Sequence, residues 1–169
     1  MSVDNATGVT PETQLAVEKF LYRQAEIVDD QKWDEWLALF ADDGKYWMPA
    51  AADQEVADGQ PNIFYEDLFL MEMRVKRVTH PYAHSQAPVQ RLSRVVSNVI
   101  IESLDTGSGD VVVRSKFHVV EYRLDAQRYF AGKYRHHLKN TADGYKIVLQ
   151  RVDIANVEGP FDYVLQTWL

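Results

Sequence analysis

The chain has 169 residues, 46% of them hydrophobic and 12% aromatic, and a formal net charge of −7. This length and composition predict one soluble globular domain over residues 1–169, with no stretch apolar enough to span a membrane. The absence of cysteine excludes disulfides, thiol nucleophiles and any iron–sulfur cluster held by this chain alone. The first residues lack the basic start and apolar stretch of a signal peptide, so a cytoplasmic location is expected.

The charge is divided unevenly along the chain. Residues 1–73 carry 16 acids and 4 bases, a net −12, whereas residues 74–169 carry 9 acids and 14 bases, a net +5. The bases are spread over predicted strands among acids, without an aromatic or glycine-rich RNA-binding pattern, so no nucleic-acid partner is expected. A charged protein–protein surface is the preferred interpretation.

The N-terminal part predicts two helices followed by an aromatic strand. Residues 1–9 are expected to form a disordered tail, and a first helix starts after Thr10 and runs to about Asp29. Asp30 can cap a second helix, whose stripe includes Trp33, Trp36, Leu37 and Phe40 and which the sequence Asp42-Asp43-Gly44 ends. A strand over residues 45–48 then contributes a third tryptophan.

The remaining elements predict a bent sheet. Residues 50–61 form a loop, 67–76 a helix and 78–88 an extended loop. Four long strand candidates follow, and the apolar side of the last one changes, which predicts a β-bulge near Gln150 and Arg151. The pattern indicates an α+β fold in which N-terminal helices pack on a strongly bent antiparallel sheet to form a cone. The strand candidates are residues 91–104, 110–124, 128–140 and 145–157.

Five segments carry a resemblance to a known family. They include an aromatic strand ending in Tyr-Trp-Met-Pro and a strand with the sequence Arg-Val-Val-Ser-Asn-Val. In order and spacing they resemble the small (β) subunit of the Rieske-type aromatic-ring-hydroxylating dioxygenases. The segments are residues 20–25, 33–49, 94–99, 130–133 and 144–147 with the strand that follows.

The resemblance implies a fold and a role. The fold is the cystatin-like cone shared with nuclear transport factor 2 and scytalone dehydratase. In the family, a large α subunit holds the Rieske 2Fe-2S cluster and the mononuclear Fe(II), and the small subunit supports an α3β3 assembly, in which β–β contacts are possible. The family's cofactor ligands have no counterpart here, so no catalytic, cofactor-binding or metal-binding residue is expected in this chain. The expected function is the assembly subunit of a dioxygenase that converts an arene to a cis-dihydrodiol.

The histidines offer a competing interpretation. His80 and His84 have the spacing of a helical metal pair, but Pro81 disfavours a helix there, so loop or interface roles are preferred. His136 is expected to face the cone interior. His118 is expected on the side of its own strand away from the apolar residues. A buried histidine paired with Asp153 or Asp43 would resemble the acid–base dyads of cone-shaped dehydratases and isomerases.

Three classes of function therefore remain open. An assembly subunit is preferred, a stand-alone lyase or isomerase is the alternative, and a pure binding module is the third. The enzyme alternative needs an open pocket, whereas the three tryptophans together with Phe64, Phe69 and Phe130 could instead fill the interior.

Two neighbouring strands carry a basic side opposite their apolar side. Such a surface cannot be core, because unpaired buried charges are too costly. It is either a solvated outer face or a subunit contact, and the resemblance favours the contact. The candidate interface residues are Arg114, Lys116, His118, Lys133, Arg135 and His137, with Lys139 continuing the row.

Overall fold

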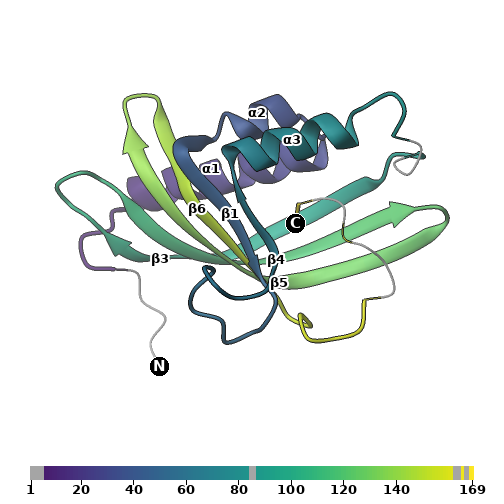
Figure 1. Cartoon of the computed structure of the whole chain (residues 1–169). Helices are drawn as coiled ribbons and strands as arrows, with labels where there is room; N and C mark the ends of the chain where they lie inside the picture. Colours follow the sequence, from purple (N-terminus) through teal and green to yellow (C-terminus); the bar gives the residue numbers. More distant parts are fainter. Residues whose placement is uncertain (1–5, 84–86, 162–164, 166–167) are drawn as a thin grey trace.

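A six-stranded sheet carries three helices on one of its faces (Figure 1). The computed structural model describes residues 6–83, 87–161, 165, 168 and 169. In chain order the elements are α1 (Pro11–Asp29), α2 (Trp33–Leu37), β1 (Phe40–Pro49), β2 (Asn62–Asp67), α3 (Leu68–Val78), β3 (Arg91–Leu104), β4 (Val111–Arg123), β5 (Ala126–Thr141) and β6 (Gly144–Ile154). The strand order is β2-β1-β6-β5-β4-β3, and neighbours are antiparallel except for the parallel pair β1 and β6. The predicted α+β fold on a mostly antiparallel sheet is confirmed.

The first helix starts where the sequence predicts. The Thr13 amide donates to the Thr10 hydroxyl at 3.2 Å, so Thr10 caps α1, and the buried face of the helix packs against β3. The predicted tail is wrong for residues 6–9, because the Ala6 amide donates to the Ile101 carbonyl at 2.8 Å and Val9 packs against the core. Residues 1–5 lie outside the described part of the chain.

The second helix is shorter than predicted. It ends at Leu37, and Asp30 caps the C-terminal end of α1 instead of starting α2. β1 begins at Phe40, so Gly44 lies within a strand rather than at a helix end. A Cβ on Gly44 would lie 2.7 Å from the Ile147 carbonyl oxygen, so the glycine allows β1 to approach β6 where their register shifts. A tertiary contact, and not a helix stop, explains this residue.

β2 is an element that the sequence pattern did not predict. It pairs with β1 at the edge of the sheet, and its last residue, Asp67, accepts the Leu70 amide at 2.9 Å. This hydrogen bond caps α3, so strand and helix follow each other without a loop.

The predicted bulge in the last strand exists, but it lies earlier than expected. Leu149 pairs with His137 and Ile147 pairs with Leu138, which leaves Val148 as the extra residue. The bulge turns Gln150 into the core, where it is buried.

The tryptophans do not all lie in one wall. Trp33 and Trp36 face the core, where Trp168 packs at 5.2 and 4.4 Å between ring centroids, whereas Trp47 lies on the outer face beneath Arg151. Phe64 and Phe130 are buried as expected, but Phe69 is exposed, because α3 turns it away from the sheet. No helix among the described residues is long and apolar enough to cross a membrane.

Candidate functional site

The cone interior contains a cluster of buried polar side chains. Gln24 on α1 donates to Gln150 on β6 at 2.5 Å, and Arg94 on β3 donates to Asp29 at 2.6 Å. His136 on β5, which is 1% exposed, faces this interior as predicted. Both of its ring nitrogens lack a hydrogen-bond partner among the described residues. The cluster is held by residues from one helix and three strands, so it depends on the tertiary fold.

The space around His136 that the described residues leave is too small for an organic substrate. The void beside His136, Tyr134 and Arg94 has a volume of about 10 Å³, which is close to that of one water molecule. Burial, with a smaller contribution from neighbouring His137, lowers the pKa of His136 to about 3, so the imidazole is neutral near pH 7. A neutral, unpaired histidine in a filled core has the features of a structural residue.

The two predicted dyads are not formed. Asp153 lies on the outer face, where Arg151 Nε donates to it at 2.9 Å, and Asp43 is exposed on β1. His118 is also exposed on the outer face. It lines the same outer hollow as Asp153, but the carboxylate there is already bound by Arg151. Neither His136 nor His118 therefore has a carboxylate positioned to work with it as an acid–base pair.

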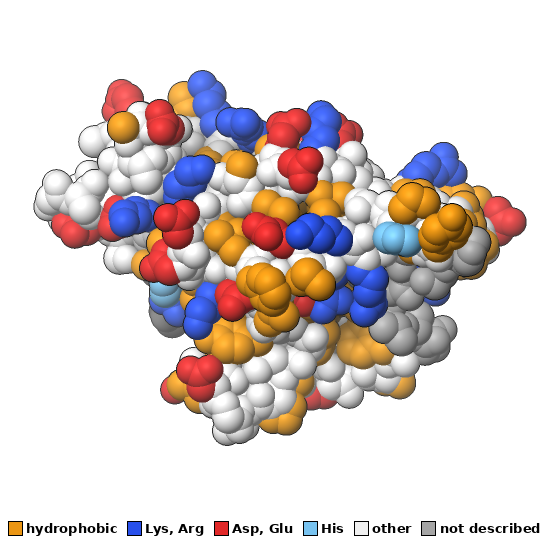
Figure 2. Space-filling model, turned by 45° about the horizontal axis from the view of Figure 1, so that its top comes forward, with side chains coloured by type: hydrophobic (Ala, Val, Ile, Leu, Met, Phe, Trp, Pro, Cys, Tyr) orange, Lys and Arg blue, Asp and Glu red, His pale blue; other side chains and the backbone are white. Residues whose placement is uncertain are grey.

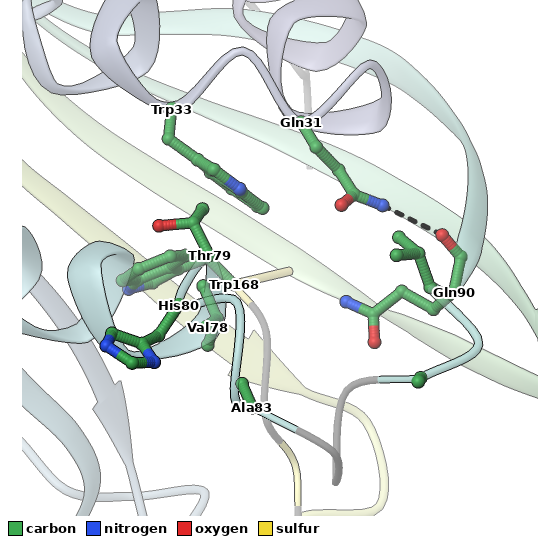
Figure 3. A pocket seen from close by; sticks show the side chains of 10 residues that line it. Gln31, Trp33, Val78, Thr79, His80, Ala83, Gln90 and Trp168 are labelled. Carbon is green, nitrogen blue, oxygen red and sulfur yellow. Dashed lines mark hydrogen bonds between the residues drawn. The ribbon is translucent and has the colours of Figure 1, made fainter.

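A second cavity opens where the core meets the segment after α3 (Figure 3). It has a volume of about 260 Å³ and lies between the rings of Trp33 and Trp168 and the residues Thr79 and His80. Gln31 closes one side by donating to the Gln90 carbonyl at 2.8 Å, as the dashed line in Figure 3 shows. None of the described residues that line it is acidic, so they offer His80 no carboxylate partner in this cavity. The other half of the predicted metal pair, His84, lies outside the described residues.

The structure places all six interface candidates on the outer face of the sheet. Arg114 and Arg135 lie opposite each other, and both bind Glu102, at 3.2 and 3.0 Å. Lys116 and Lys133 also lie opposite each other, but neither forms a salt bridge within the described residues. Like charges that face each other across strands are unfavourable, and Asp153, which lies opposite Lys133 on β6, is already paired with Arg151.

A hollow of about 520 Å³ lies beside the lysine pair. Small residues of β5 line it together with His118, three bases and one acid. These residues are Ala131, Gly132, Lys116, Lys133, Arg151 and Asp153. A concave basic surface of this kind fits an acidic group better than a second basic one. The sequence predicted the basic row. It did not predict the hollow, because the strands and loops that line the hollow are distant from one another in sequence.

The described residues do not form a metal site. The sequence has no cysteine, and no group of three or more histidine, aspartate or glutamate side chains among the described residues could hold a metal ion. A Rieske cluster needs two thiolates and a non-haem iron site needs a histidine–carboxylate set, so this donor set fits neither.

Comparison with known proteins gives a consistent result. A family model described as "Ring hydroxylating beta subunit" matches residues 23–157. The benzene 1,2-dioxygenase subunit beta of Pseudomonas putida is 33% identical over 151 residues, which cover 83% of this chain and 80% of that protein. The benzoate 1,2-dioxygenase subunit beta of Acinetobacter baylyi is 27% identical over 168 residues, covering 96% and 95%.

Solved structures show the same architecture. The beta subunit of the benzoate 1,2-dioxygenase from Burkholderia mallei superposes with a TM-score of 0.70 at 28% identity, covering 88% of this chain and 95% of that one. A chain of naphthalene 1,2-dioxygenase superposes with a TM-score of 0.77 at 19% identity, covering 96% of this chain and 89% of that one. At this identity the match shows a similarity of fold alone.

Proposed function

Because the chain belongs to the ring hydroxylating beta subunit family, we propose that it is the non-catalytic small subunit of an aromatic-ring-hydroxylating dioxygenase. The arene is converted to a cis-dihydrodiol on a partner α subunit, which carries the Rieske 2Fe-2S cluster and the mononuclear Fe(II). This chain holds the α subunits in register in a cytoplasmic α3β3 assembly.

The observation that carries the non-catalytic role is the filled interior. A cone-fold enzyme binds its substrate inside the cone, and here the space beside His136 is about 10 Å³. An arene cannot enter such a void without displacing core side chains. The unpaired histidine and the unsuitable donor set support the same conclusion.

The outer face of the sheet is the proposed contact with the α subunit. Arg114 and Arg135 are held in place by Glu102. The neighbouring lysines Lys116 and Lys133 form no salt bridge within the described residues, and Asp153 opposite Lys133 is paired with Arg151. Charge complementarity of this kind sets register and speeds association. The other expected members of the contact, His118 and His137, lie on the same face.

Charge reversal tests this proposal. Arg135→Glu reverses the charge that this face presents to the α subunit at every copy of the contact, and we expect a loss of several kcal/mol of assembly free energy. Co-expressed α subunit should then elute separately on gel filtration, while circular dichroism shows a folded small subunit. Lys19→Glu on the exposed side of α1 makes the same change of charge elsewhere and should assemble normally.

Two results would contradict the proposal in different ways. A full-size assembly formed by the Arg135→Glu protein would show that the outer face is merely solvated. Full turnover by the α subunit in the absence of this chain would remove the assembly role itself.

A further inference from the structure

Helix α3 presents large apolar side chains to solvent. Its inner side buries Met71 and Val75, but Phe69 and Met73 on the outer side are 66% and 50% exposed. Tyr82, in the segment after the helix, is 78% exposed. Exposed apolar side chains that gather in one place often mark an interaction site, unlike single scattered ones.

Met73 and Tyr82 border a groove. It has a volume of about 750 Å³ and runs between α3 and residues 80–83. Figure 2, which brings the helical side of the molecule forward, shows apolar side chains interspersed with basic and acidic ones over this face. We call this surface the α3 groove, and its main lining residues are Glu66, Leu70, Met73, Arg74, Arg77 and Tyr82.

The floor of the α3 groove is held rigid from below. Glu66 accepts from Arg74 Nε at 2.7 Å and from Trp168 Nε1 at 3.1 Å. The Arg74 guanidinium also lies over the ring of Phe64, 4.5 Å from its centroid. A surface that is already ordered loses little conformational entropy when a partner binds, which favours a high affinity.

The chemistry of the α3 groove identifies the kind of occupant. Methionine, tyrosine and arginine, which are enriched in protein interfaces, all line this groove. Glu66, the acid among the lining residues, is already bound by Arg74. Lys76 and Arg77 form no salt bridge within the described part of the chain, and together with Arg74 they outnumber Glu66, so the described lining is net basic. The complementary ligand is an apolar side chain flanked by carboxylates.

We propose that the α3 groove docks a segment of the catalytic partner subunit, with an apolar side chain against Met73 and Leu70 and acidic neighbours against Lys76 and Arg77. This inference rests on the proposed function, since it takes the partner to be the catalytic subunit. It assigns the partner a second contact surface, on the opposite side of the sheet from Arg135 (Figure 1).

Two matched substitutions test the α3 groove. Met73→Glu puts a carboxylate into the groove against an acidic partner. Leu15→Glu on α1 makes the same change at a helical position that is 51% exposed, against 50% for Met73. Both side chains face solvent, so both variants should fold, which circular dichroism checks. The affinity for the purified catalytic subunit is measured by biolayer interferometry at two salt concentrations.

We expect Met73→Glu to weaken binding by at least about thirtyfold, as at an interface hot spot, and Leu15→Glu by less than about twofold. Arg77→Glu should slow association and reduce its dependence on salt. Equal affinities for the Met73→Glu and Leu15→Glu proteins would overturn the docking site while leaving the proposed function intact. No binding by the wild-type chain would overturn both. Self-association of the isolated wild-type chain in sedimentation, abolished by Met73→Glu, would make the occupant a second copy and overturn the assignment to the catalytic subunit.

Discussion

Acid should destabilise this protein through one buried side chain, His136. Its imidazole is 1% exposed, and its two nitrogens have no hydrogen-bond partner among the described residues. Burial, and to a smaller extent His137, lowers its pKa from 6.5 to about 3 in the folded state. In the unfolded chain the imidazole is solvated and keeps a pKa of about 6.5.

The sign and the size of the effect follow from this difference. Above pH 6.5 the imidazole is neutral in both states, so its protonation does not affect stability. As the pH falls from 6.5 towards 3, the unfolded chain binds a proton that the folded chain does not, and the free energy of unfolding decreases. At about 1.4 kcal/mol per pH unit, the loss from His136 at pH 5 is about 2 kcal/mol.

Replacing the imidazole isolates this contribution. His136→Leu keeps a similar volume and removes two unpaired nitrogens, so at pH 7 its free energy of unfolding should change by less than about 1.5 kcal/mol. Between pH 7 and pH 5, urea unfolding should show that it loses about 2 kcal/mol less than the wild type. His118→Gln, at an exposed position, should lose as much as the wild type. Equal losses in the His136→Leu protein and the wild type would refute a buried neutral imidazole.

Three further outcomes are expected. Trp168→Ala should cost about 3–5 kcal/mol of unfolding free energy, because its ring is buried against two other tryptophans, and Trp168→Phe, which loses the hydrogen bond to Glu66, about 1–3 kcal/mol. If urea unfolding shows the same loss of free energy for Trp168→Ala as for Trp168→Phe, the contacts of the tryptophan ring contribute little. Gly44→Ala should cost on the order of 2 kcal/mol, because its Cβ would lie 2.7 Å from the Ile147 carbonyl, whereas Gly107→Ala in a surface turn should stay within about 0.5 kcal/mol. Elemental analysis of the purified chain should find no stoichiometric iron, and about one iron per chain would contradict the assignment of the cofactors to the partner.

Local pattern was sufficient for much of the fold. Thr10 followed by Pro11 predicts the start of α1, and the alternation along β4 correctly separates its buried side from the basic side that carries Lys116 and His118. These predictions succeed because a helix cap and a strand period involve residues only a few positions apart. The inward direction of His136 follows from the same alternation and is confirmed.

Other features depend on contacts between distant segments, and there the local signal was misleading or absent. Gly44 was interpreted as a helix stop, but its lack of a Cβ serves the approach of β1 to Ile147 in a parallel pair. The sequence also allows Phe69 to fill the interior, yet a short helix can turn only one side to the sheet, so Phe69 remains outside.

The sequence by itself determined the helix-then-sheet order, the basic strand sides and the absence of thiolate ligands. Only the tertiary structure decided that the interior is filled, because the side chains that fill it come from opposite ends of the chain. Trp168 reaches Glu66 across the core, and Gln24 reaches Gln150. Sequence periodicity indicates which side of an element is buried, but not which side chains it is buried against. Whether a filled core or a pocket forms depends on those opposing side chains.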